Sequence, residues 1–396
     1  MARSNTRLYA ASALVVIALF GVAGVLVAKL IARNGDAGST AAVAAEVVVP
    51  TGPLAVTPTS VFSEVGSDPS APSWAKNGRL LAFEVPRAFG TVKLFAAEVQ
   101  DDGRAFVTAV APDGTTQKQR FRLMQQPSWF GTEVLFEGQI ERSAVRRIFR
   151  APPNGGAALE VFDATVVEGT LADVAVDSSM VGRIAFVNHS MEDGDLFLWD
   201  PRVGKAKPID PAPGIEHSPV FTPDGNSLVY AREVAGDDDL WQVDFRKGKG
   251  TLLVGGTGDQ IRPVVLPDGR ILFLTSVDGR TWDIAITNGT AVNTIAPNVK
   301  LPARSGPAFT PDGLWVAWVG TEPKTNMLRF TSMTDGRLVQ IEALGVSDLD
   351  EVRVTQKDGM TKVAFVAGPP GARSLYAAEV SDYLVPPPFT AAAPSP

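Results

Sequence analysis

The chain has 396 residues, of which 45% are hydrophobic and 20% are charged, and this composition excludes collagen-like and wholly disordered proteins. It has no cysteine and only two histidines, which excludes disulfides, thiolate nucleophiles, cysteine-ligated metals and a multi-histidine metal site within one chain. The formal net charge of −7 argues against binding to nucleic acid, because proteins that follow a phosphate backbone usually carry a basic face.

An apolar segment near the N-terminus predicts a membrane anchor. Residues 8–28 contain no charged side chain, and at about 1.5 Å per residue a helix of this length spans roughly 30 Å of hydrocarbon. We therefore expect a cytoplasmic N-terminus over 1–7, a transmembrane signal anchor over 8–32 and a linker over 33–53. A cleaved signal peptide is the alternative, because Ala42-Val43-Ala44 resembles a cleavage site.

The remainder of the chain is acidic. Four of the 36 basic residues and none of the 43 acidic residues lie in the first 35 positions, so the rest carries a net charge of −11. Basic residues flank the apolar run almost equally, and the α-amino group favours a cytoplasmic N-terminus. We expect a single-pass protein of the cell membrane whose larger part lies on the extracytoplasmic side, periplasmic or extracellular.

The body of the chain is a repeat. Three segments share a Pro-x-x-x-Pro-Asp-Gly pattern, and they start 44 residues apart, at Pro219, Pro263 and Pro307. Each is followed by an apolar run and by two further strand-like runs. In each copy Pro pre-sets φ, Asp caps the turn and Gly accepts positive φ, which predicts a tight hairpin after the first strand. The nine residues of these turns are Pro223, Asp224, Gly225, Pro267, Asp268, Gly269, Pro311, Asp312 and Gly313.

Weaker copies precede and follow these three. They start near residues 72, 127, 175 and 353, which makes seven units of about 44 to 55 residues. Several β-branched and aromatic runs per unit, separated by Gly, Asp and Pro, indicate propeller blades rather than helical repeats. The sequence thus predicts an all-β fold with a β-propeller of seven blades over 54–385, with six or eight blades as alternatives.

Ring closure requires one more strand. The last unit lacks its outer strand, and residues 54–65 have strand character, so we expect this segment to complete the last blade. Residues 386–396 consist mostly of Pro and Ala and are expected to form a disordered tail.

The pattern Pro-x-Phe-Thr-Pro-Asp-Gly, an apolar strand and then Asp-Leu-Trp or Asp-Leu-Phe resembles the TolB-type β-propeller repeat. This resemblance implies the propeller fold and a tendency to bind partners, without naming the partner. The chain departs from TolB itself, because only a linker stands where TolB has an α/β domain. It departs from the peptidases of the family because it has no Gly-x-Ser-x-Gly elbow and no room for a hydrolase domain.

Three polar residues are candidates for a ligand site. His217, Arg262 and Arg304 lie just before the prolines of three successive units, at positions that tend to approach the mouth of a propeller's central channel. Together they would form a polar funnel for a small anion. Scattered solvated side chains are the simpler alternative.

Other motifs are interpreted as turns. Ser276–Trp282 resembles the Asp-box of sialidase-like propellers, but it lacks one residue of the spacing and occurs once. The acidic clusters Glu192–Asp195 and Asp237–Asp239 could supply oxygen ligands for Ca²⁺, but neither has EF-hand spacing. We expect no cofactor and no bound metal.

The sequence favours a membrane-anchored, non-catalytic protein-interaction or scaffold module of the cell envelope, which binds an envelope protein and no nucleic acid. No catalytic residues are assigned. A propeller enzyme of the lactonase or glycosidase kind, or a ligand sensor that uses the channel mouth, remains the alternative, because such residues come one per blade and leave no local motif.

Overall fold

The computed structural model describes residues 54–102, 104–162, 170–177, 182–189, 194–210, 212–302 and 305–384. Within these ranges no helix is long and apolar enough to cross a membrane. The predicted anchor, the linker and the Pro/Ala tail lie outside the described residues, as does Arg304.

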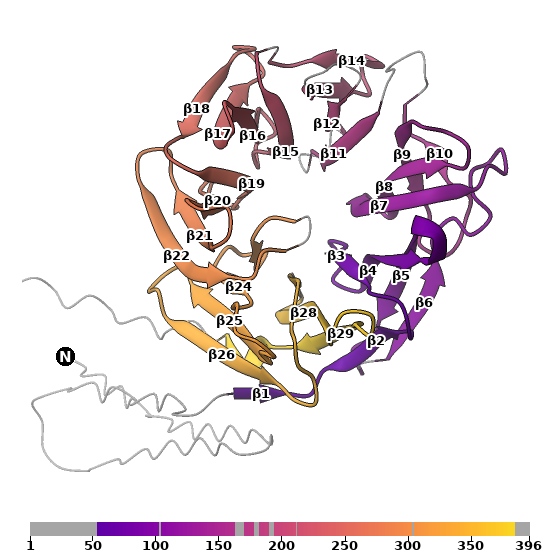
Figure 1. The fold of residues 1–396 in the computed structure, drawn as a ribbon, viewed down its shortest axis with the longest axis vertical. Helices are drawn as coiled ribbons and strands as arrows, with labels where there is room; N and C mark the ends of the chain where they lie inside the picture. The colour runs from indigo at the N-terminus through magenta and orange to yellow at the C-terminus, as the bar shows by residue number, and fades with distance from the viewer. Residues whose placement is uncertain are drawn as a thin grey trace, which may run out of the picture. The chain divides into compact units, whose positions relative to one another are not determined.

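Seven sheets follow one another around a ring, as Figure 1 shows from indigo to yellow. This confirms the predicted all-β propeller with seven blades. Blade 1 contains β3 (Ser70–Trp74), β4 (Leu80–Arg87), β5 (Thr91–Val99) and β6 (Ala105–Ala109). Blade 2 contains β7 (Phe121–Phe130), β8 (Glu133–Ile140), β9 (Arg146–Ala151) and β10 (Leu159–Glu160). Blade 3 contains β11 (Leu171–Val176), β12 (Ile184–Asn188), β13 (Asp195–Asp200) and β14 (Lys205–Pro208).

The next two blades carry the strongest copies of the repeat. Blade 4 contains β15 (Ile215–Phe221), β16 (Ser227–Val234), β17 (Asp237–Asp244) and β18 (Gly250–Val254). Blade 5 contains β19 (Asp259–Val265), β20 (Ile271–Ser276), β21 (Trp282–Thr287) and β22 (Val292–Val299). In each of blades 1–5 the four strands pair antiparallel in chain order, because short hairpins join them.

The last two blades take strands from both ends of the described chain. Blade 6 contains β23 (Ala308–Phe309), β24 (Trp315–Trp318), β25 (Met327–Ser332), β26 (Leu338–Ala343) and β1 (Leu54–Val56). Blade 7 contains β27 (Val352–Lys357), β28 (Met360–Ala367), β29 (Ser374–Glu379) and β2 (Thr59–Ser63). Two single-turn 3₁₀ helices complete the described secondary structure, η1 (Ala88–Gly90) and η2 (Ser381–Tyr383).

The N-terminal segment closes the ring. Strand β2 pairs antiparallel with β29, which confirms that the segment before the first repeat supplies the missing outer strand of the last blade. Strand β1 adds a contact that the sequence analysis did not foresee, because it pairs in parallel with β26 on the outer edge of blade 6. The Tyr383 hydroxyl also donates a hydrogen bond to the carbonyl of Ala55, at 2.7 Å. One short segment therefore holds two blades together and covers both of their edges.

The hydrophobic core is divided among the joints between blades. The described residues contain seven buried apolar clusters, and each combines side chains from two neighbouring blades. Six of the seven second strands place a fully buried aromatic ring in this core, namely Phe83, Phe136, Phe186, Tyr230, Phe273 and Phe365. Burial of rings of this size stabilises six of the seven joints.

Candidate functional site

The inner strands carry a shared backbone irregularity. In blades 1–5 the register between the first and second strands shifts, and a residue with positive φ lies within each shift. These residues are Ala71, Gln126, Asp173, Ser218 and Arg262, with φ values of 49–53°. Non-glycine residues rarely adopt this region, so neighbouring contacts must hold them there.

Carboxylates provide several of these contacts. Glu84 accepts a hydrogen bond from the backbone N–H of Gln126 at 2.6 Å, and Glu137 accepts one from Asp173 at 2.8 Å. Asp173 in turn accepts the N–H of Ser218 at 3.0 Å. Each bond joins one blade to the next, and Glu84 and Glu137 are almost completely buried. These acidic groups therefore hold the ring together.

His217 is tied to the neighbouring hairpin of its own blade. Its Nε2 lies 2.7 Å from Asp238 Oδ1, and its Nδ1 lies 3.2 Å from Ser218 Oγ. Burial lowers the pKa of His217, but the hydrogen bond to Asp238 and the charges of Asp238 and Asp173 outweigh burial and the repulsion from Arg262, and they raise the pKa above its ordinary value. When His217 is protonated, the pair is a charge-assisted hydrogen bond.

Arg262 lies in the inner strand of blade 5, near His217. The charge of Arg262 lowers the pKa of both His217 and Arg353, so the three groups interact electrostatically. Its Nη1 donates a hydrogen bond to the carbonyl of Pro302. Two of the three residues suggested by the sequence, His217 and Arg262, thus lie close enough to interact, and the third, Arg304, is outside the described residues.

The Pro-Asp-Gly turns lie at the far ends of the inner strands. Asp224 Oδ1 accepts hydrogen bonds from Thr222 Oγ1 at 2.6 Å and from the Asn226 N–H at 3.1 Å. These bonds lower the pKa of Asp224 to about 2. Gly225, with φ of 65°, supplies the positive φ that the turn requires. Asp268 and Asp312 cap their turns through the N–H groups of Arg270 and Leu314.

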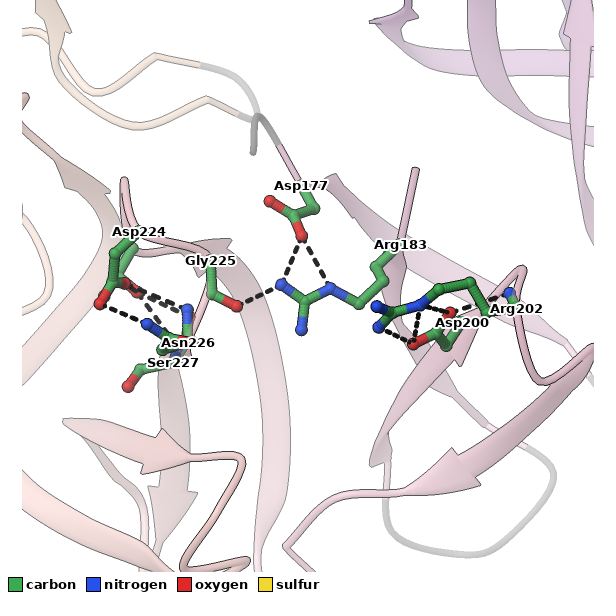
Figure 2. Close-up of polar contacts among 9 residues, drawn as sticks. Asp177, Arg183, Asp200, Arg202, Asp224, Gly225, Asn226 and Ser227 are labelled. Carbon is green, nitrogen blue, oxygen red and sulfur yellow. Dashed lines mark hydrogen bonds and ion pairs between the residues drawn. The ribbon is translucent and has the colours of Figure 1, made fainter. Parts of the chain in front are cut away.

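One such turn also contacts the preceding blade, as Figure 2 shows. Arg183 pairs with the buried Asp177 at 2.6 Å and donates a second hydrogen bond to the carbonyl of Gly225. Its guanidinium also lies over the rings of Phe221 and Phe245. The turn residues therefore have structural partners.

The acidic clusters and the Asp-box-like segment also form local structure. Asp237–Asp239 is not a solvated turn but the beginning of β17, because its backbone pairs with Arg232–Val234. Asp238 binds His217, and Asp239 accepts the N–H of Gly256 at 3.3 Å. Asp278 caps a hairpin by accepting the N–H groups of Arg280 and Thr281 at 2.9 and 2.8 Å. Residues 192 and 193 of the other acidic cluster lie outside the described residues.

A buried ionic network in blade 4 was missed by the sequence analysis. Arg232 donates hydrogen bonds to Glu216 Oε1 at 2.8 Å and to Asp210, and the Tyr230 hydroxyl donates to Asp210 at 2.6 Å. Burial raises the pKa of Glu216 to about 7, although Arg232 opposes this shift. The guanidinium of Arg232 lies over the Trp241 ring, with Cζ 4.5 Å from the ring centre.

Comparison with known proteins finds similarity in structure only. No protein-family model and no curated protein sequence matches the chain. A puromycin-hydrolysing peptidase from Mycobacterium tuberculosis matches with a TM-score of 0.57 and 14% identity, over 81% of this chain and 54% of that chain. A puromycin hydrolase matches with a TM-score of 0.57 and 15% identity, over 81% and 55%. TolB from Acinetobacter baumannii matches with a TM-score of 0.49 and 14% identity, over 77% and 65%.

These matches concern the fold. The seven blades confirm the β-propeller fold that the repeat predicted. The chain spans between about half and two thirds of the length of these proteins. At 14–15% identity they establish no activity for this chain.

Proposed function

We propose that this protein is a non-catalytic interaction module of the cell envelope, held at the membrane by residues 8–32 with its propeller on the extracytoplasmic side. The partner is an envelope protein. One observation carries the non-catalytic part: the carboxylates Glu84, Glu137 and Asp173 near the inner strands accept backbone N–H groups of adjacent blades. Groups engaged in this way support the ring rather than reacting with a substrate.

Two structural neighbours are named as hydrolases, and their names favour a catalytic role. Their matches cover little more than half of those proteins, and the chain has no Gly-x-Ser-x-Gly elbow. The propeller is the part that both share with this chain. Propellers of unrelated proteins use the same ring of blades for many purposes.

Protease accessibility in cells tests the location. In intact cells with a permeabilised outer layer, added protease should cleave a tag placed after Pro396 and spare a tag placed before Met1. Membrane fractions should retain the full-length chain. Cleavage of the N-terminal tag instead, or recovery of the chain in the soluble fraction, would contradict the proposal.

Purified full-length protein tests the absence of catalysis. Panels of ester, lactone, amide and glycoside substrates should show no turnover above buffer. Turnover that disappears in the His217→Asn variant, while the Arg270→Gln variant retains it, would overturn the non-catalytic assignment.

A further inference from the structure

An exposed aromatic ring lies at the tip of a hairpin in blade 1. Phe89, in η1 between β4 and β5, is 97% exposed, and its backbone has φ of 60° and ψ of 29°. Gly, Asn or Asp adopts this left-handed conformation with less strain than a bulky side chain does. Phe89 therefore costs the fold twice, through backbone strain and through apolar surface in water. Such a cost indicates that the ring serves a contact outside the chain.

A second apolar side chain lies beside this hairpin. Arg87 and Glu64 form an ion pair at 2.6 Å, which brings the turn after β2 next to the hairpin that carries Phe89. Val65 follows Glu64 in that turn and is 99% exposed. Because the ion pair neutralises both of its charges, this corner of blade 1 presents an apolar surface.

Basic side chains gather where blade 2 adjoins this corner, and the two blades are neighbours in the ring (Figure 1). Lys93 of β5 donates a hydrogen bond to the carbonyl of Phe121 at 2.7 Å, which places it beside the start of β7. The N–H of Glu141 donates to the carbonyl of Arg120 at 2.8 Å, so Arg120 lies next to the β8–β9 hairpin. Hairpins between the second and third strands lie at one end of a propeller, so the β4–β5 and β8–β9 hairpins share that end.

Three arginines of this region are available to a partner. Arg120, Arg122 and Arg142 are exposed, and none of them forms an ion pair within the described ranges. Arginines in other turns are neutralised locally, since Arg104 and Arg202 each pair with an aspartate two residues away. The chain as a whole has a net charge of −7, so this local excess of positive charge is opposite in sign to the rest of the protein. It would attract an acidic partner.

We propose that Phe89 and Val65, together with Arg120, Arg122 and Arg142, form a docking surface for an acidic segment of the partner protein. Carboxylates of the segment bind the arginines, and an apolar side chain packs on Phe89. The inference rests on the proposed function, which supplies the partner. Phe and Arg are enriched in protein interfaces, and a guanidinium binds a carboxylate through two parallel hydrogen bonds. An anionic bilayer fits less well, because the net charge of −11 beyond residue 35 would be repelled by it.

Peptide binding to the purified full chain, measured by fluorescence anisotropy, tests the proposal. The probes are labelled acetyl-Asp-Glu-Leu-Phe-Glu-Asp-amide and the same peptide with Asn and Gln in place of Asp and Glu. The acidic peptide should bind roughly tenfold more tightly than the neutral one, and added salt should reduce this difference. Equal binding of the two peptides, or binding of neither, would overturn the proposal.

Detergent micelles with added lipid distinguish a protein segment from a membrane surface. Micelles that contain phosphatidylglycerol should displace no more of the acidic peptide than micelles that contain phosphatidylcholine. Displacement by phosphatidylglycerol alone would indicate a lipid-binding surface and would contradict the proposal.

Charge variants locate the surface. The double variant Arg120→Gln/Arg142→Gln should weaken binding of the acidic peptide by roughly tenfold. The control Arg246→Gln/Lys247→Gln removes the same charge from an exposed turn between third and fourth strands, at the other end of the ring, and should bind as the wild type does. Equal affinities of the two double variants would refute the assignment.

A substitution at the hairpin tip separates docking from folding. Phe89→Asn places a residue that tolerates positive φ at the tip, so the melting temperature should stay the same or rise, while peptide binding should fall by roughly tenfold. Val203→Asn is the control, because Val203 is 67% exposed in a turn at the other end of the ring. Wild-type affinity in Phe89→Asn would show that the ring does not take part.

Crosslinking in native cells distinguishes a failure of this inference from a failure of the proposed function. The wild type should capture an envelope protein, and a variant that combines Phe89→Asn with Arg120→Gln and Arg142→Gln should capture much less of it. Equal capture by the variant would refute the docking surface and leave the scaffold role intact. No capture by the wild type would overturn both.

Discussion

The backbone N–H of Ala71 donates a 2.6 Å hydrogen bond to Glu351 Oε2, across 280 positions of the chain. The bond joins blade 7 to blade 1, at the same joint that β2 closes through its pairing with β29. Ala71 has φ of 49°, so the bond also holds a strained backbone. Closure therefore combines strand exchange at the outer edge with a carboxylate contact at the inner strand.

Removal of this contact should weaken the ring. Glu351→Gln replaces a charged acceptor by a neutral one and should lower the free energy of unfolding by about 1–2 kcal/mol. Glu98→Gln on the exposed side of β5 is the matched control and should change it by less than about 0.5 kcal/mol. Urea unfolding compares the two. Equal midpoints for both variants would show that the contact does not contribute to closure.

The joint between blades 3 and 4 depends on Arg183 (Figure 2). Arg183→Met leaves the fully buried Asp177 carboxylate without its guanidinium and should cost about 3–5 kcal/mol. The double variant with Asp177→Asn should recover much of this loss, because no buried charge remains.

An exposed pair on the same side provides the control. Arg202→Met removes the partner of Asp200 and should cost less than about 1 kcal/mol, because Arg202 is largely exposed. Denaturant midpoints measure all three variants. A double variant as unstable as Arg183→Met alone would show that the buried charge is not the cause.

The pKa of His217 should lie above its ordinary value. The chain has only two histidines, so the NMR signals of His217 can be assigned by comparison with a His189→Asn variant. In Asp238→Asn the pKa of His217 should fall, because its largest favourable contact is lost while burial and the charge of Arg262 remain.

The raised pKa of His217 makes the free energy of unfolding depend on pH. A raised pKa means that the folded state favours the protonated imidazole, so His217 stabilises the fold most below pH about 6.5, and this contribution is lost as the pH rises through the folded-state pKa. An unchanged pKa in Asp238→Asn would contradict the charge-assisted pair.

Glu216 should make the protein less stable as the pH rises from about 4.5 to about 7. Its pKa is raised from 4.5 to about 7, so the folded state holds a proton that the unfolded state has already released. The loss over this range should be about 3 kcal/mol. Glu216→Gln should remove this pH dependence, and Glu98→Gln should keep it. Parallel stability curves for wild type and Glu216→Gln would refute the assignment.

The sequence predicts the blades because their signals are local. Pro223-Asp224-Gly225 contains a whole hairpin turn, and its recurrence every 44 residues reveals the period. The closing strand is also predictable, because the last unit lacks one. The pairing of β1 with β26 is not, since a parallel contact on an outer edge is set by where the chain passes and not by a residue pattern.

Side-chain contacts of the inner strands are also hard to predict, because no local residue pattern sets them. The sequence grouped His217 and Arg262 because they occupy neighbouring positions just before the prolines of successive units. Glu351 was missed because it reaches Ala71 only after two blades have packed, and the contact between Asp238 and His217 was missed because it depends on how the strands of blade 4 pair. The positive φ of Ser218 also has no signature, because the carboxylate of Asp173 that contacts its N–H lies 45 residues away.

Crosslinking of the full-length protein in its native cells, followed by affinity purification and mass spectrometry, tests the scaffold role most directly. The account predicts a reproducible, near-stoichiometric envelope protein, with crosslinks that map to one face of the propeller. Recovery of the intact, membrane-bound chain with no enriched partner would contradict the account.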